Sequence, residues 1–513
     1  MKKSRLDYSI INSGISTGIY IVRLIVQFVA RTFFIKYLGT EILGLNGLFT
    51  NILSLLSVAD MGIGTSIIFS MYKPLSNNDH EQVKSLMALY KKAYEAIGAT
   101  IAIIGLALVP FLHLIVANSQ RFPQLYLIYI LFLANSVVSY FFTYKRSLIS
   151  ADQKAYIVSL NDFFFLLITN IFQIVFLMIT ANFVIYLVIQ IISTVAGNIC
   201  ISVIVDHRYP YIKEKHVNKL DQDSVQEIKK NVIGNVSSKV GGQLVTGTDN
   251  ILISTFVNLT AVGLYSNYTL IINALLSVCT QMTTSITASI GNFAVSEDEK
   301  GANRLYRRYF FINHSLAYFT SVILMVMLNP FIQVWIGNKF ELPLLTVVLI
   351  VVNFSIQVYR NTSFVFIQSY GLFWYQRTKA FIEAAINLSV SLILLIIFKL
   401  GINGVLIGTT VSSFGFVLWY EAYVIYKHAL KRPMREFVWL QLRSMIEVSV
   451  LGLITYFGVN QIMKLVGVEG VVGLVIRVIF AGVIALVLYI VSYWKHEDAQ
   501  YLWRIIKHTL RME

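Results

Sequence analysis

Three polar side chains lie in the first long apolar run of the chain, where a surrounding bilayer would give them no partner. Arg23, Gln27 and Arg31 follow one another at intervals of four residues, so a helix places them on one face. A charge at the centre of a bilayer costs at least about 2.5–3.5 kcal/mol on insertion scales, so it should face a cavity or a partner. Arginine donates paired hydrogen bonds to phosphate oxygens. The stripe therefore predicts a surface for an anionic, phosphate-bearing substrate.

Two further basic residues lie in later apolar runs and could extend this surface. Lys239 is in the run that an internal repeat pairs with the first run, and Arg360 is in another. Simpler roles are open for the three arginines. Arg31 could extend to the nearby membrane surface, and Arg23 and Arg360 could each form a structural ion pair with a buried acid.

Two acidic residues are candidates for carrying a coupling ion. Asp60 lies close to Gly62 and Gly64, which weaken a helix and let backbones approach closely. A carboxylate in such a pliable membrane segment can carry a proton or a cation. Asp249 lies in a later run. The alternatives are that Asp60 pairs with Arg23 and that Asp249 forms a hydrogen bond between helices. Four other acids lie nearer the ends of runs and are expected at the membrane interface: Asp162, Glu383, Glu421 and Glu447.

Membrane-spanning helices must position these residues. Of the 513 residues, 57% are apolar and 13% are charged, which is too apolar for a soluble globular chain. A bilayer core about 30 Å thick needs about 20 apolar residues per helix, and lipid offers an open backbone no partner. The prediction is an all-α polytopic membrane protein with about 14 transmembrane helices. The runs are 9–36, 42–72, 93–117, 124–146, 156–179, 183–205, 231–256, 261–292, 309–334, 343–369, 378–398, 402–427, 441–462 and 470–494.

The runs repeat six at a time in the same orientation. A Leu-Tyr pair followed by two basic residues leads into the third run at 89–92 and into the ninth at 305–308, and Gly44 matches Gly263 at a similar offset. A parallel repeat of this kind builds two similar bundles with a substrate site between them. We expect an N-terminal six-helix lobe, a cytoplasmic linker, a C-terminal six-helix lobe, and two extra helices with a cytoplasmic tail: 1–205, 206–230, 231–430 and 431–513.

The distribution of charge predicts the orientation. The formal net charge is +15, and the basic residues gather at the ends of runs rather than on a surface for nucleic acid. With the N-terminus inside, about 31 basic residues fall on the inner side against about 5 on the outer side, which is a clear positive-inside pattern. Both termini are therefore predicted to be cytoplasmic.

Several kinds of chemistry lack a matching motif. The sequence has no phosphate-binding Gly-rich loop ending in Lys and Ser or Thr, and no His-Glu-x-x-His or Cys-x-x-Cys pair. Cys200 and Cys279 both lie inside apolar runs and are expected to be unpaired. Outer-side glycosyltransferases and polymerases need a long outer loop, and no loop here is long enough. We therefore expect no catalytic residues, no metal site and no cofactor.

The order of several short motifs resembles one transporter family. The chain is similar to the polysaccharide exporters, which are lipid-linked oligosaccharide flippases of the multidrug/oligosaccharidyl-lipid/polysaccharide superfamily. The resemblance covers about residues 8–430. It rests on Asn12-Ser13-Gly14, Arg31, Tyr37-Leu38-Gly39, Gly44-Leu45, the segment 59–64, Thr248-Asp249-Asn250 and Val262-Gly263-Leu264-Tyr265.

This resemblance implies a fold and an activity. The fold would be MATE-like, with two lobes around a central cavity that opens alternately inward and outward. The activity would be transfer of undecaprenyl-diphosphate-linked oligosaccharide units to the outer leaflet of a bacterial cytoplasmic membrane, for capsule or another surface polymer. Coupling to protons or sodium is implied, as is a polysaccharide polymerase that uses the product. The implied substrate contacts are Arg23, Gln27, Arg31, Lys239 and Arg360, and the implied coupling residues are Asp60 and Asp249.

Three other transporter classes share part of this pattern. A peptidoglycan-precursor flippase also has fourteen spans in this superfamily, and its extra pair forms a groove for the lipid tail. A drug/cation antiporter of the same fold would need an acidic or aromatic cavity, which Arg23 and Lys239 argue against. The major-facilitator class carries a Gly-rich basic loop after the second span, where this chain has Lys73-Pro74-Leu75-Ser76-Asn77-Asn78.

Overall fold

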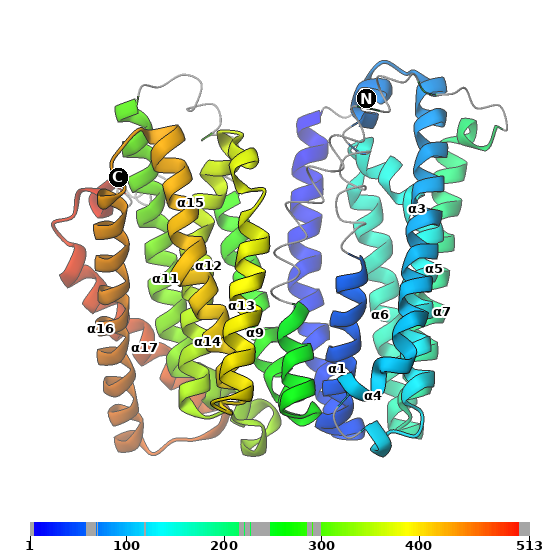
Figure 1. The fold of residues 1–513 in the computed structure, drawn as a ribbon. Helices are drawn as coiled ribbons and strands as arrows, with labels where there is room; N and C mark the ends of the chain where they lie inside the picture. Colours follow the sequence, from blue (N-terminus) through cyan, green and yellow to red (C-terminus); the bar gives the residue numbers. More distant parts are fainter. Residues whose placement is uncertain are drawn as a thin grey trace. The chain divides into compact units, whose positions relative to one another are not determined.

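The computed structural model describes residues 5–57, 68, 70–116, 119–214, 220, 226, 247–284, 290 and 299–501 (Figure 1). All regular elements among these residues are helices, which confirms the all-α class. The longer helices are α1 (Arg5–Leu56), α3 (His80–Leu108), α4 (Leu112–Ile115), α5 (Leu125–Ala151), α6 (Ala155–Thr180), α7 (Phe183–Arg208), α9 (Leu259–Thr284), α11 (Glu299–Ile336), α12 (Leu344–Ser369), α13 (Lys379–Ile396), α14 (Ile402–Ser412), α15 (Leu418–Ile425), α16 (Arg435–Val466) and α17 (Gly470–Tyr493).

The number of membrane helices agrees with the sequence once two differences are explained. Within the described part of the chain, twelve helices are long and apolar enough to cross a membrane. The run 9–36 and the first part of the run 42–72 share the single helix α1, which ends at Leu56 and is kinked at Gly39. Gly39 has a φ of 81°, a left-handed conformation that favours glycine. The run 231–256 lies mostly outside the described residues. The protein is therefore a multi-pass membrane protein with close to the predicted fourteen spans.

The chain divides into two compact units, Met1–Gly263 and Leu264–Glu513. In the first unit α6 packs on α1 and α7, and α5 packs on α3 and α7. In the second unit α11 packs on α12, α16 and α17, while α13 pairs with α14. The lobe and linker boundaries expected from the sequence stay predictions.

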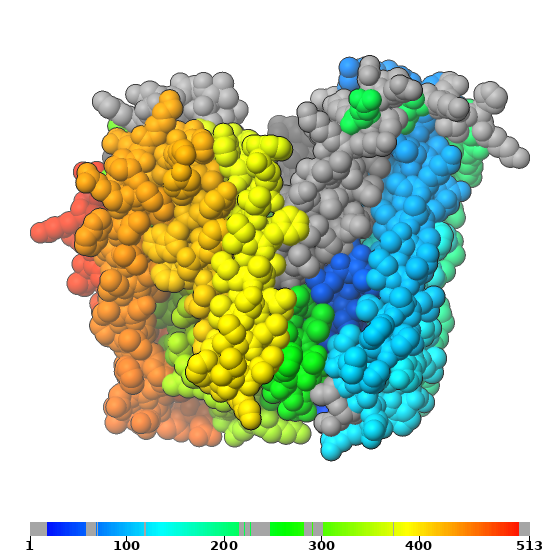
Figure 2. Space-filling model, viewed as in Figure 1, coloured from blue at the N-terminus to red at the C-terminus, as the bar shows by residue number. Residues whose placement is uncertain are grey.

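Large apolar side chains cover the outside of the helices, as contact with lipid requires. Ile103 on α3 is 69% exposed, Ile179 on α6 is 73% exposed and Val491 on α17 is 74% exposed. Figure 2 shows α3 in light blue, covering one face of its unit from end to end. Insertion into a bilayer removes this apolar area from water, which is favourable.

The last two helices are attached to α11 by polar contacts as well as by apolar packing. His314 is 1% exposed and lies between the hydroxyls of Tyr359 (2.7 Å) and Tyr493 (2.6 Å). Tyr493 donates its own proton to Glu447, so it accepts from Nε2 of His314, and Nδ1 accepts from Tyr359. Tyr318 adds a hydrogen bond from its hydroxyl to the carbonyl of Ala485 at 2.9 Å.

Two glycines matched by the sequence repeat contact each other's helices within the unit Met1–Gly263. A Cβ on Gly44 would lie 1.9 Å from the carbonyl oxygen of Leu259, and a Cβ on Gly263 would lie 2.2 Å from that of Thr40. Thr40 and Leu259 each precede the matched glycine by one helical turn. The contact is therefore reciprocal, and α1 crosses the start of α9 backbone against backbone.

Candidate functional site

A polar cavity lies inside the first unit and contains two of the predicted substrate residues. Its volume is about 630 Å³, within the range of small-molecule sites. Arg23 and Gln27 line it from α1, so the predicted stripe does face a cavity. The opposite lining comes from α6 and α7, with Arg146 added from α5.

The start of α7 fixes which of its side chains face this cavity. Asn182 caps the helix, because its side-chain oxygen accepts from the backbone N–H groups of Val184 (2.8 Å) and Ile185 (3.4 Å). From that start, Tyr186 and Gln190 both lie on the cavity wall. The cap thus sets the register of the polar face of α7.

Hydrogen bonds between α6 and α7 hold the polar wall in place. Asn161 donates to the carbonyl of Gly197 at 3.2 Å, and Gln173 donates to the carbonyl of Tyr186 at 3.1 Å. Each side-chain amide keeps an oxygen that can accept from a ligand. The full set of uncharged polar lining residues is Tyr20, Gln27, Ser159, Asn161, Thr169, Asn170, Gln173, Tyr186, Gln190, Ser193, Thr194 and Asn198. Amides and hydroxyls at this density suit a ligand rich in hydroxyl groups.

Among the described residues that line the cavity, Arg23 is the cation without a carboxylate partner. Arg146 pairs with Asp162 at 2.8 Å. Arg23 is exposed and forms no ion pair with any carboxylate among the residues that the structure describes. An arginine that faces a polar cavity without an acidic partner is suited to bind an anionic group.

Arg31 lies two helical turns further along α1, outside the cavity lining. Its Nη1 atom is buried and has no hydrogen-bond partner within the described part of the chain. It interacts electrostatically with Tyr186, which does line the cavity. Tyr186 is held against Phe34 edge to face, with ring centroids 5.2 Å apart. A buried donor without a partner is costly, by about 1–3 kcal/mol, so Arg31 is a candidate for a ligand contact beside the cavity.

Arg360 lies in the second unit and is fully engaged by acids. It contacts Glu383 at 3.1 Å and Glu421 at 3.2 Å, and Lys379 contacts Glu421 at 2.5 Å. The sequence placed both acids at the membrane interface. Their side chains are instead only 5% and 3% exposed, because they neutralise two cations between α12, α13 and α15. The structural ion pair considered for Arg360 is therefore present, and a substrate contact by Arg360 stays a prediction.

Of the three remaining predicted residues, Asp249 lies among those that the structure describes. Asp249 is 7% exposed and lies in the helical segment 247–256. That segment packs on α1, because a Cβ on Gly247 would lie 2.6 Å from the Leu55 side chain. Asp60 and Lys239 lie outside the described residues. No cluster of metal-ligating side chains is found in the described ranges.

The sequence analysis missed the polar wall opposite Arg23. Asp162 was expected at the membrane interface, but it lines the cavity with its partner Arg146. A usable signal was present in α7, where Tyr186, Gln190 and Thr194 repeat at helical spacing in an apolar run. Tyrosine, asparagine and glutamine side chains within the spans were expected to suit sugars, but the sequence did not indicate which of them share one wall.

Solved structures show the same fold in known transporters. The lipid II flippase MurJ, in an inward closed conformation, matches with a TM-score of 0.66 and 12% identity, over 93% of this chain and 98% of its own. An inward-facing multidrug resistance MATE family transporter of the MOP superfamily matches with a TM-score of 0.62 and 14% identity, over 80% and 97% of the two chains. A MOP superfamily transporter from Pyrococcus furiosus, with a binding pocket of reversed polarity, gives 0.51 and 14%, over 82% and 95%. The fold is therefore MATE-like, as predicted.

Comparison at the level of sequence identifies the family. No curated protein matches the chain. The sequence profile of the family described as "Polysaccharide biosynthesis protein" matches residues 10–290, which is more than half of the chain. This match also confirms the resemblance drawn from the short motifs. The chain belongs to the polysaccharide biosynthesis protein family and has the fold of MATE transporters and MurJ.

Proposed function

We propose that this protein is a flippase, which moves undecaprenyl-diphosphate-linked oligosaccharide units from the inner to the outer leaflet of a bacterial cytoplasmic membrane. The units would serve assembly of a capsule or another surface polysaccharide, and a polysaccharide polymerase would use them on the outer side. Both termini would be cytoplasmic. The protein would not be an enzyme, and a proton or sodium gradient would drive alternating access.

One observation carries the proposal: Arg23, which has no acidic partner among the residues that the structure describes, faces an amide-bearing cavity inside the membrane-spanning first unit. The guanidinium of Arg23 suits phosphate oxygens, and the side chains of Gln27, Asn170 and Gln190 suit sugar hydroxyls. The guanidinium of Arg23 would repel a cation at this wall. Membership of a polysaccharide biosynthesis family supports the same class of substrate.

The other predicted residues have roles in this proposal. Arg31 would contact the diphosphate beside Arg23, and Lys239 and Arg360 would extend the basic surface. Asp60 and Asp249 would take up the coupling ion, because protonation or sodium binding changes their charge inside the membrane. The substrate and the coupling ion would each bind one conformation of the transporter more tightly, and each would shift the equilibrium toward that conformation.

A second candidate is a flippase for a peptidoglycan precursor. The match to MurJ covers 93% of this chain, so it cannot leave out both α16 and α17, whereas a match over 80% can. The substrates of both candidate flippases carry a diphosphate on a polyprenyl chain. They differ in the sugar that the cavity must accept.

Transport in proteoliposomes tests the proposal. Fluorescent undecaprenyl-diphosphate oligosaccharide is reconstituted with the wild type, Arg23→Ala or Arg23→Lys, without nucleotide, and movement between leaflets is followed by dithionite quenching. We expect loss of transport in Arg23→Ala and partial activity in Arg23→Lys, because a lysine keeps the charge but not the paired hydrogen bonds.

A membrane-embedded arginine outside the cavity provides the control. Arg477 on α17 donates to Asn460 at 2.6 Å and does not line the cavity, so Arg477→Ala should keep transport if it folds. Full activity of Arg23→Ala would refute the role of Arg23. Faster movement of lipid II than of the oligosaccharide lipid would favour the second candidate, and extrusion of cations alone would remove both.

A further inference from the structure

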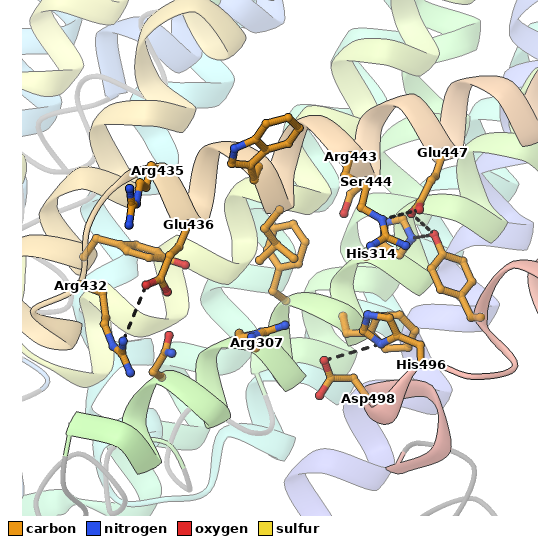
Figure 3. Close-up of a pocket in the computed structure, with 17 residues that line it drawn as sticks. Arg307, His314, Arg432, Arg435, Glu436, Arg443, Ser444, Glu447, His496 and Asp498 are labelled. Atoms are coloured by element: carbon orange, nitrogen blue, oxygen red, sulfur yellow. Dashed lines mark hydrogen bonds and ion pairs between the residues drawn. The ribbon is translucent and has the colours of Figure 1, made fainter.

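A second charged cavity lies in the other unit, between α11 and the last two helices. Its volume is about 760 Å³. Figure 3 shows Arg432, Arg435 and Glu436 at one end of it, His314 and Glu447 at the other end, and Arg307 between them. The proposed function does not use this cavity.

Both glutamates in the lining are already paired with arginines. Glu436 pairs with Arg432 at 3.7 Å, and Glu447 pairs with Arg443 at 2.8 Å. The remaining acid of the lining is Asp498, which lies 3.8 Å from a ring nitrogen of His496 and forms an ion pair there when that histidine is protonated.

Two arginines remain without such a partner. Neither Arg307, on α11, nor Arg435, at the start of α16, forms an ion pair with a carboxylate in the ranges that the structure covers. Both are exposed. The cavity therefore presents two solvated guanidinium groups, from two different helices, toward one space.

The start of α16 adds a positive potential of a second kind. The helix begins at Arg435, and no side chain caps it. The N–H of Glu436 already donates to the carbonyl of Pro433 at 3.1 Å, so the contribution of the helix start is the positive end of the dipole of a helix of 32 residues, beside the guanidinium of Arg435. The guanidinium groups and the positive end of the helix both favour an anionic ligand.

Two tryptophans place this cavity at the level of lipid headgroups. Trp439 lines the cavity and is 76% exposed, and Trp494 directly follows α17 and is 73% exposed. Exposed tryptophans gather where the membrane meets water. From Trp439 onward, one face of α16 continues with exposed apolar side chains at helical spacing: Leu442, Ile446, Val450, Leu453 and Phe457. The cavity thus adjoins a face of the helix that contacts lipid.

We propose that this cavity binds the phosphate-bearing headgroup of a membrane lipid through the guanidinium groups of Arg307 and Arg435. Basic pockets between membrane helices near the cytoplasmic surface bind anionic headgroups in this way. Arg307 and Arg435 belong to the basic ends of runs that the positive-inside pattern assigns to the cytoplasmic side. A diphosphate fits two separated guanidinium groups better than a single phosphate diester, so a polyprenyl diphosphate should bind more tightly than phosphatidylglycerol.

Lipid binding to the purified full-length protein tests the site. Native mass spectrometry follows titration with undecaprenyl diphosphate, phosphatidylglycerol or inorganic pyrophosphate, for the wild type and for R307Q/R435Q. We expect the double variant to bind one lipid fewer, or to bind that lipid at least about tenfold more weakly, since each charge-assisted contact contributes a factor of this order. Added salt should weaken the same binding event.

A matched double variant removes equal charge from nearby positions that do not line the cavity. Arg304 lies one turn before Arg307 on α11, and Lys431 directly precedes Arg432. R304Q/K431Q should bind lipid as the wild type does. Thermal unfolding of both double variants checks folding, and the single variants R307Q and R435Q replace the double variant if its melting temperature falls.

The outcomes separate the possible ligands and separate this site from the proposed function. Loss of undecaprenyl diphosphate binding, or of phosphatidylglycerol binding, only in R307Q/R435Q supports the site and says which lipid fills it. Equal lipid binding by both double variants would overturn it, as would binding of inorganic pyrophosphate as tightly as the lipid. Arg23→Ala should leave this lipid bound, so failure of transport and failure of this site are distinguished.

Discussion

Glu421 is the centre of the buried ion cluster of the second unit. It contacts both Arg360 (3.2 Å) and Lys379 (2.5 Å), whereas Glu383 contacts Arg360 alone at 3.1 Å. Removing one partner of a buried pair leaves a charge without compensation, at about 3–5 kcal/mol. We expect Glu421→Gln to lower the free energy of unfolding by that order, and Glu383→Gln to lower it less. Thermal unfolding in detergent, followed by tryptophan fluorescence, measures both.

The comparison of the two amide variants is the control, because each replaces one buried carboxylate with an isosteric group. If Glu383→Gln unfolded at a lower temperature than Glu421→Gln, the cluster would not be centred on Glu421. If neither variant differed from the wild type, the cluster would contribute nothing to stability.

Charged residues of the site were predictable at this scale, and their partners were not. Arg23 was predicted because a charge in an apolar run needs a cavity or a partner, and Gln27 because it lies one helical turn after Arg23. The partners of Arg360 lie on α13 and α15, and spacing along one helix carries no information about side chains on another. The wall of Asn161, Gln173 and other amides was missed because uncharged residues lower the hydropathy only slightly.

Close contact between helices decides the role of Gly44. A Cβ there would lie 1.9 Å from the carbonyl oxygen of Leu259, and this neighbour is backbone that cannot turn aside. We expect Gly44→Ala to push α1 away from the backbone of Leu259, in the same unit, and to cost about 1–3 kcal/mol of stability, as overpacking does. Gly18 on the same helix has nothing within 4 Å of its Cβ position. Gly18→Ala should therefore be neutral or stabilising, by up to about 1 kcal/mol.

Melting temperatures of the two alanine variants test this contact directly. A lower value for Gly44→Ala and an unchanged or higher value for Gly18→Ala is the expected pattern. Equal values for both variants would show that α1 and α9 are not held at backbone contact.

The positions of most helices followed from apolar runs, and their joints did not. The run boundary near residue 39 was read as a loop between two spans. It is a one-residue kink within α1, because Gly39 alone takes the left-handed conformation. A glycine next to charged residues predicts a turn as readily as a kink, since hydropathy records where helices cross lipid and not how the backbone connects them.

At the scale of the whole molecule, α16 and α17 are integral to the second unit, although they lie outside the repeat. They share apolar clusters with α11, in which Val326 packs with Val459 and Ala481. They also supply the partners of His314 and Tyr318. Without them, a buried imidazole and a buried phenol of α11 would face lipid with an unmet hydrogen bond, which membranes penalise strongly.

The chain should therefore depend on its last two helices for stability as well as for lipid contact. We expect a protein ending at Leu430 to accumulate poorly and to elute as aggregate in fluorescence-detected size-exclusion chromatography. Co-expression of residues 431–513 as a separate fragment should restore a monodisperse peak, because the lost contacts are non-covalent. Ending the chain at Tyr501 is the control, since it keeps α16, α17 and their contacts with α11. A stable protein ending at Leu430 that still transports substrate would show that α11 needs neither helix, and that lipid binding between them is dispensable for the transport cycle.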